Sequence, residues 1–232
     1  LDLTPDGTQA VVVARGSGEL WVYDVADLFG SPEVITLPED GTFGSVILSP
    51  DDTKGLLYST ATSESIYASW DRTDPDAETA ITTHPLVKPV SQATISPTGG
   101  TALIFHPEEN TDDSDPFYDD HYGISMVDLD SFLSNDYRLT GEPTAYADSD
   151  DGTHGFFVME EEQYLQVLTY SSLILDEVEL KSDPVHVGVL PDTAWAYVSQ
   201  EHDLGRISFY DAETDDLNTI TGFELNSGIE EY

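Results

Sequence analysis

The sequence predicts an all-β protein, a β-propeller of four-stranded antiparallel blades, of which five can be recognised. A short turn motif recurs along the chain, and its prolines Pro5, Pro50, Pro97 and Pro191 are 45, 47 and 94 residues apart. β-branched and aromatic residues dominate the segments between the turns, and no segment keeps a strong helical period. Four strands in a period near 47 residues are typical of a propeller blade.

The recurring motif joins the end of one apolar strand to a second strand through a Ser/Thr-Pro-Asp-Gly-like turn. Proline presets φ and glycine accepts a positive φ, so the motif predicts a tight reversal inside each blade. Its copies are Leu3–Gly7, Leu48–Asp52, Ile95–Gly99 and Val189–Asp192. Because the last gap is twice 47 residues, a further copy is expected midway, and Ala147–Gly152 supplies it without the proline.

The remaining strands follow from the apolar segments after each turn. Second strands are predicted at Ala10–Ala14, Gly55–Ser59, Ala102–Phe105, Gly155–Met159 and Trp195–Ser199. Third strands end in an apolar-Asp signature at Trp21–Asp24, Ser125–Asp128 and Ser208–Asp211, and fourth strands are expected at Glu33–Leu37, Ala80–Thr83 and Leu217–Thr221. We expect one domain, residues 1–232, with blades at about 1–40, 41–88, 89–141, 142–182 and 183–232.

The fifth unit carries a family resemblance. Thr193–Gln200 followed by Ile207–Asp211 resembles the YVTN-type, lactonase-like propeller repeat, and the Ser-Pro-Asp turns resemble the wider group of WD40-like propellers. The resemblance covers all five units and is weakest in the fourth. It implies the fold, because such propellers include lactonases, dehydrogenases, surface-layer proteins and interaction modules.

The number of blades stays open between two alternatives. The first unit lacks most of its innermost strand, so Phe223–Ile229 could supply it and close a five-bladed ring. The resemblance implies seven blades more often than five, which favours a portion of a six- to eight-bladed propeller. The chain opens on Leu1 rather than Met, and we expect a processed or truncated form of a longer protein.

The acidity of the chain excludes some partners. With 46 Asp and Glu against 7 Lys and Arg, the net charge is −39, which argues against nucleic acid and against an anionic membrane surface. The longest apolar run, Ala10–Ala14, is far too short for membrane insertion. The absence of cysteine excludes disulfides and thiolate chemistry.

The negative charge has three candidate explanations: adaptation to high salt, a calcium-rich surrounding and a basic partner. The near absence of lysine favours a global adaptation over a local patch.

One long loop in the third unit, Pro107–Tyr122, is the candidate cation site. Carboxylates at short intervals are hard oxygen ligands suited to Ca²⁺, and long loops in compact domains are often functional. The candidate ligands are Asp112, Asp113, Asp115, Asp119 and Asp120. The spacing does not match an EF-hand, so a solvated acidic loop is the alternative that the composition favours. A second acidic run, Asp148–Gly152, coincides with the predicted blade turn, which favours a structural role.

The histidines give weaker signals. His186 alternates with valines in an inner strand and is a candidate for lining a central channel, whereas His202 and Asp203 lie in a loop that could form a rim site. No zinc-ligand spacing, nucleophile elbow or phosphate-binding loop occurs.

These observations predict a non-enzymatic binding or scaffold module that works through blade edges and loops. We expect an extracytoplasmic location (periplasmic, cell-surface or secreted) and a protein partner or surface assembly, with Ca²⁺ as the one candidate cofactor. The alternative is a lactonase-like hydrolase with a metal-dependent site at the central channel.

Overall fold

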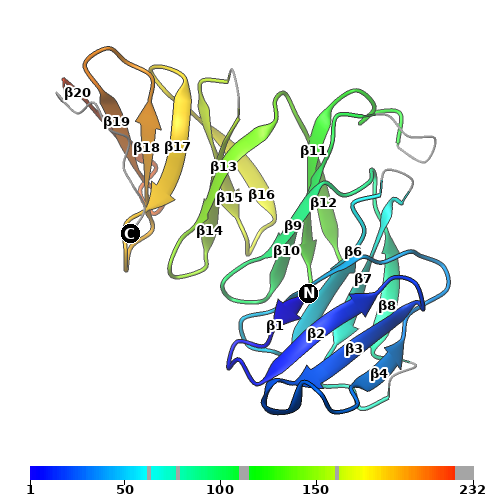
Figure 1. The fold of residues 1–232 in the computed structure, drawn as a ribbon. Coiled ribbons are helices and arrows are strands. Elements are labelled where there is room, and N and C mark those ends of the chain that lie inside the picture. Colours follow the sequence, from blue (N-terminus) through cyan, green and yellow to red (C-terminus); the bar gives the residue numbers. More distant parts are fainter. Residues whose placement is uncertain (62–63, 77–78, 110–114, 160–161, 223–232) are drawn as a thin grey trace. The chain divides into compact units, whose positions relative to one another are not determined.

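The computed structural model describes residues 1–61, 64–76, 79–109, 115–159 and 162–222. Over these residues the chain forms five four-stranded sheets and one short 3₁₀ helix, Val25–Asp27 (η1) (Figure 1). The predicted fold class, an all-β propeller architecture of four-stranded antiparallel blades, is confirmed. Two units can be distinguished, Leu1–Arg138 and Leu139–Tyr232, and each is described by itself. The single-domain organisation stays a prediction, as does the total number of blades.

The first unit holds three sheets. The first contains β1 (Asp2–Leu3), β2 (Gln9–Ala14), β3 (Glu19–Asp24) and β4 (Glu33–Thr36). The second contains β5 (Ser45–Leu48), β6 (Lys54–Tyr58), β7 (Ile66–Asp71) and β8 (Ile81–Pro85). The third contains β9 (Gln92–Ile95), β10 (Thr101–His106), β11 (Tyr122–Asp128) and β12 (Ser134–Leu139).

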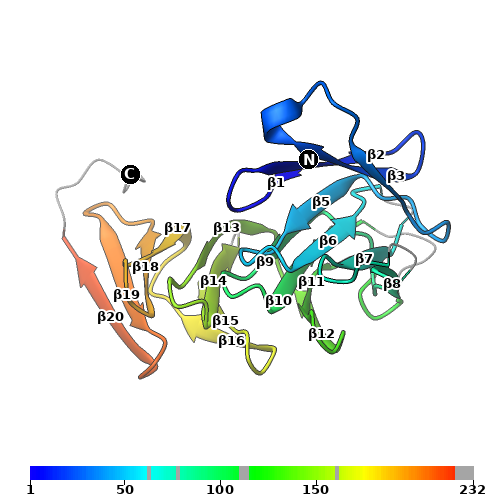
Figure 2. The ribbon, with the colours of Figure 1, turned by 90° about the horizontal axis from the view of Figure 1, so that it is seen from below.

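The second unit holds two sheets, which Figure 2 shows from another side. The fourth sheet contains β13 (Pro143–Asp148), β14 (His154–Met159), β15 (Tyr164–Thr169) and β16 (Ile174–Glu179). The fifth contains β17 (Pro184–Val189), β18 (Trp195–Gln200), β19 (Arg206–Asp211) and β20 (Asp216–Thr221). In all five sheets each strand pairs antiparallel with the next strand of the chain, as in a simple meander.

Most predicted strands lie within two residues of their observed bounds. The fourth strand of the second sheet was expected at Ala80–Thr83 and is found at Ile81–Pro85. The 3₁₀ turn η1 was not predicted; the Asp24 side chain accepts a hydrogen bond from the Ala26 amide at its start. Phe223–Ile229, proposed to close a ring, lies outside the described residues.

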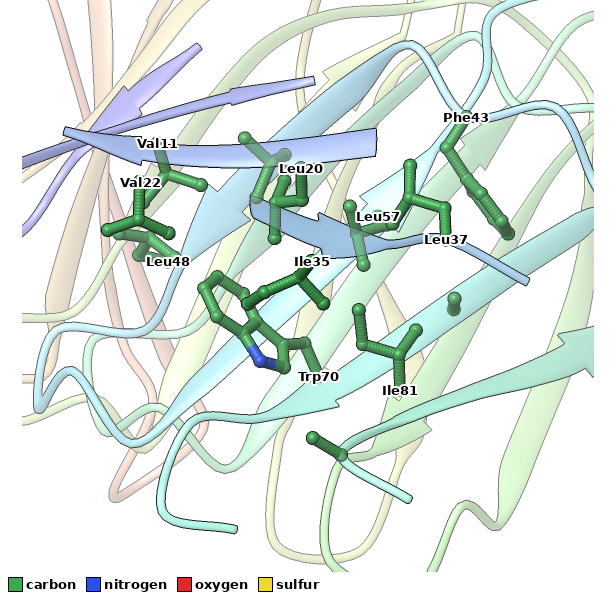
Figure 3. Packing of buried hydrophobic residues seen from close by; sticks show 13 residues of the cluster. Val11, Leu20, Val22, Ile35, Leu37, Phe43, Leu48, Leu57, Trp70 and Ile81 are labelled. Atoms are coloured by element: carbon green, nitrogen blue, oxygen red, sulfur yellow. The ribbon is translucent and has the colours of Figure 1, made fainter. Parts of the chain in front are cut away.

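The core of the first unit lies between facing sheets. Because alternate residues of a strand point to opposite faces, Leu57 packs toward the first sheet and Leu56 toward the third, and both are fully buried. Figure 3 shows Ile35 of β4 meeting Trp70 and Ile81 of the second sheet. In the second unit, Phe156 of β14 packs with Val198 and other residues of the fifth sheet. Some inner strands are buried on both faces, as in β10, where all six residues are buried.

The recurring turn is built by side-chain hydrogen bonds. The Ser49 hydroxyl donates to Asp51 at 2.6 Å and accepts from the Lys54 amide at 2.9 Å. Asp51 also accepts from the Thr53 amide and hydroxyl, and these donors, Ser49 first, lower the pKa of Asp51. Similar hydroxyl–carboxylate turns occur at Thr4–Thr8 and Ser149–Thr153. The structural interpretation of Asp148–Gly152 is thus confirmed.

One position in these turns requires a left-handed backbone. Glycine fills it at Gly7, Gly99 and Gly152, whereas the second sheet places Asp52 there with φ of 59°. Aspartate tolerates this conformation better than most residues, which explains why the Pro-Asp-Asp variant still forms the turn.

Candidate functional site

A cleft of about 410 Å³ lies between the second and third sheets of the first unit. Its size falls in the range of small-ligand pockets. The start of β6, the end of β7, the start of β8 and the loop before β12 contribute its walls. The lining residues are Thr53, Lys54, Gly55, Ser69, Trp70, Asp71, Thr73, Asp74, Thr79, Ala80, Thr82, Leu129, Asp130 and Phe132.

The charged lining of the cleft is predominantly acidic. Three carboxylates, Asp71, Asp74 and Asp130, face one ammonium, that of Lys54. Lys54 Nζ lies 2.5 Å from Asp130 Oδ1, and the Asp130 side chain is 77% exposed. Hydrogen bonds from Thr73, and to a smaller extent the Lys54 charge, lower the pKa of Asp71. The lining therefore carries a net charge of minus two at neutral pH.

Aromatic rings support one wall of the cleft. The His84 ring is stacked between Tyr67, with centroids 4.8 Å apart, and Phe132, with centroids 4.4 Å apart. His84 Nε2 also lies 3.0 Å from Ser69 Oγ, which lines the cleft. Burial lowers the pKa of His84, so the ring is neutral at pH 7. The stack holds Phe132, with its left-handed φ of 58°, against the cleft.

A second cleft, of about 260 Å³, lies on the other side of Trp70. Here the Arg72 guanidinium carbon lies 4.5 Å from the Trp70 ring centroid, a cation–π contact. Arg72 also pairs with Asp52 at 2.9 Å and donates to Gln9 at 3.0 Å. The chain itself thus supplies a cation to this second cleft.

A fully buried lysine contacts the long loop of the third sheet, between β10 and β11. Lys88 Nζ donates to three backbone carbonyls: Glu108 O at 3.1 Å, Tyr118 O at 3.1 Å and His121 O at 2.6 Å. Burial lowers the pKa of Lys88, and Asp119 is the strongest of the carboxylates that oppose this shift. The ammonium thus joins the two ends of the loop through their backbone carbonyls.

The predicted calcium ligands are placed as follows. Asp112 and Asp113 lie outside the described residues. Asp115 is exposed and accepts a hydrogen bond from the Phe117 amide, Asp119 is half-buried, and Asp120 is exposed with φ of 57°. Within the described ranges, no group of three or more His, Asp or Glu side chains is arranged to hold a metal ion. The calcium loop stays a prediction.

Behind this loop lies a buried hydrogen-bonded chain. His106 Nδ1 is 2.9 Å from Pro89 O, its Nε2 is 2.8 Å from Ser125 Oγ, and Ser125 Oγ is 2.5 Å from Asp136 Oδ1. The single hydroxyl proton of Ser125 serves one neighbour at a time. Burial lowers the pKa of His106 to about 4, so the imidazole is neutral at pH 7. Because Ser125 is fully buried, the chain links strands rather than presenting a nucleophile.

The second unit has its own polar cluster. Both Tyr146 and Tyr170 donate to Asp148 Oδ1, and the two phenol oxygens are 2.6 Å apart. Burial raises the pKa of Asp148 and of both tyrosines. Gly155 pairs with Asp148 across the strands, and a side chain there would overlap the Tyr170 phenol.

The remaining sequence candidates lie in the fifth sheet. His186, on β17, is half-buried, and its ring centroid is 6.4 Å from that of Tyr197. Its role in lining a channel stays a prediction. His202 and Asp203 are exposed in the loop between β18 and β19, where His202 Nδ1 accepts from the Leu204 amide. His202 and Asp203 belong to the second unit, whereas the acidic loop of the third sheet belongs to the first.

Sequence reasoning missed the cleft and the Lys88 contacts. Lys88 is one of only three lysines, and it lies between Val87 and Pro89 in an apolar segment. A lone lysine in such a segment was the available signal for a buried cation. The cleft offered no comparable signal, because its residues come from four separate segments of the chain.

Comparison with known proteins supports the fold. No protein-family model matches the chain. No curated protein matches it either. A solved structure of a eukaryotic initiation factor is similar with a TM-score of 0.70 and 11% identity, over 95% of this chain and 53% of that one. Kuenenia stuttgartiensis hydrazine synthase is similar with a TM-score of 0.52 and 12% identity, over 97% of this chain and 66% of that one.

A further similar structure is a functionally unknown protein from Desulfotomaculum acetoxidans DSM 771, with a TM-score of 0.54 and 16% identity, over 95% of this chain and 68% of that one. The chain thus spans from about half to about two thirds of these structures. Identities this low show a common propeller-like fold alone. None of the helices in the described ranges has the length and apolarity to span a bilayer.

Proposed function

We propose that this protein is a non-enzymatic, extracytoplasmic binding or scaffold module of the YVTN/lactonase-like propeller type. The observation that carries the proposal is the cleft between the second and third sheets, which combines carboxylates, hydroxyls and apolar side chains on a rigid β scaffold. Sites built on strands and short turns hold their side chains in place, which favours recognition of a partner.

The charge supports a partner or medium that is rich in cations. Part of the acidity serves the fold, because carboxylates such as Asp51, Asp128 and Asp151 accept hydrogen bonds in turns. These bonds satisfy individual groups and leave the net charge of −39 unscreened. Cations in the medium or on a partner would reduce the self-repulsion of such a surface. We therefore propose that the protein is stabilised by cations and acts outside the cytoplasm.

A peptide selection tests the binding function. The protein is immobilised and used to select from a random peptide library at 150 mM NaCl, beside an unrelated protein of similar net charge. We expect enriched peptides that share a motif and bind in solution by calorimetry. Recovery of the same peptides on both proteins would refute specific recognition. Hydrolysis of a panel of lactones, followed as acid release with and without Ca²⁺, would instead support the lactonase-like alternative.

A further inference from the structure

The two clefts beside Trp70 differ in the net charge of their linings. In the smaller one, the Arg72 guanidinium lies over the indole ring, and together with Glu33 and Asp74 it gives the lining a net charge of minus one. In the larger one, Asp71, Asp74 and Asp130 share a single internal ammonium. The larger cleft therefore has the greater excess of negative charge, minus two, which its single lysine does not balance.

The walls of the larger cleft are amphipathic. Leu129, Phe132 and the edge of Trp70 provide apolar surface, and the three carboxylates lie among the hydroxyls of threonines. A lysine or arginine side chain has the matching form, since its methylene groups pack on apolar surface while its charged head pairs with carboxylates. Lys54 of the chain itself already enters the cleft and pairs with Asp130 in this way.

We propose that this cleft binds a lysine or arginine side chain of a basic partner segment, next to the resident Lys54. The inference rests on the proposed binding function and names its site and the chemistry of its partner. A neutral saccharide is the less favoured occupant. Phe132 is 41% exposed and could stack on a sugar, whereas Trp70 is only 5% exposed. A neutral ligand would, however, leave the excess carboxylate charge unpaired.

The proposal predicts effects of opposite sign for two substitutions. The Asp130→Asn variant removes one carboxylate and should weaken the binding of a tetralysine peptide by about fivefold. Lys54→Met removes the competing ammonium and should strengthen the same binding by about fivefold. Both side chains are at least partly exposed, so folding should persist and is checked by circular dichroism.

Two charge-matched controls separate the cleft from the overall charge. Glu179→Gln changes an exposed carboxylate on β16, and Lys181→Met changes an exposed ammonium, both in the second unit. Binding of tetralysine, its fully acetylated form and a neutral tetrasaccharide is measured by calorimetry at 150 mM NaCl. We expect binding of tetralysine alone, with little change in either control.

Each other outcome has a defined meaning. If the cleft variants and their controls shift the affinity equally, the peptide binds to diffuse charge and the cleft assignment is overturned, while the binding function is untouched. Equal binding of the acetylated peptide overturns recognition of a cation. Competition by the saccharide assigns the cleft to carbohydrate instead. Failure of tetralysine to bind overturns the cleft assignment. The binding function is refuted only if the peptide selection also yields no peptides specific to this protein.

Discussion

Replacing Lys88 with methionine should destabilise the protein through the loop of the third sheet. The substitution keeps an unbranched side chain of similar length but removes the ammonium. It leaves the carbonyls of Glu108, Tyr118 and His121 without their donor in a place where Lys88 is fully buried.

The magnitude follows from two opposing effects. A hydrogen bond from a charged donor stabilises by roughly 1.5–3 kcal/mol, so loss of three such bonds would cost several kcal/mol. The variant also avoids the desolvation of a buried ammonium, which offsets several kcal/mol. Breaking a buried ionic contact by removing one partner generally costs about 3–5 kcal/mol. We expect about 3 kcal/mol, the lower end, because Glu108 is an exposed residue.

Thermal denaturation followed by circular dichroism measures the effect. A loss of about 3 kcal/mol should lower the Tm by roughly 6–12 °C for a chain of this size. Lys181→Met is the matched control, because its side chain is exposed, and it should change the stability by less than about 0.5 kcal/mol. Equal melting temperatures for the two variants would show that the Lys88 ammonium contributes no net stability.

Three further predictions concern pH, packing and salt. The folded-state pKa of His106 is about 4 and its ordinary value is 6.5, so protonation of the unfolded state should reduce stability by about 3 kcal/mol as pH falls from 6.5 to 4. His106→Gln should reduce this pH dependence of the unfolding free energy, measured by urea titration, while His202→Gln should not. Equal pH dependence in the two variants would contradict the attribution to His106. Gly155→Ala should cost about 2 kcal/mol by displacing Tyr170, whereas Gly16→Ala, with no atom within 4 Å, should be nearly neutral in the same melts. The Tm should rise from low to molar NaCl, and a flat response would refute the role of charge repulsion; the calcium-loop hypothesis requires a further rise in millimolar Ca²⁺ at matched ionic strength.

The sequence alone was sufficient to predict the five sheets. Their turns are local, because a hydroxyl such as Ser49 and a carboxylate such as Asp51 two residues later close the reversal by themselves. Strand identity is local as well, since β-branched and aromatic segments between such turns have no competing helical period. Bounds were less certain where a strand ends without a capping motif, as at the end of β8.

Tertiary structure decided the sites. The Lys88 ammonium meets carbonyls 20 to 33 residues away, and the cleft joins β6, β7, β8 and the loop before β12. Side-chain hydrogen bonds within a turn are encoded in a few adjacent residues, whereas these contacts depend on how one sheet packs on the next. Composition could count the carboxylates but could not show which of them share a cleft with one lysine. That distinction arises only when the second and third sheets are packed together.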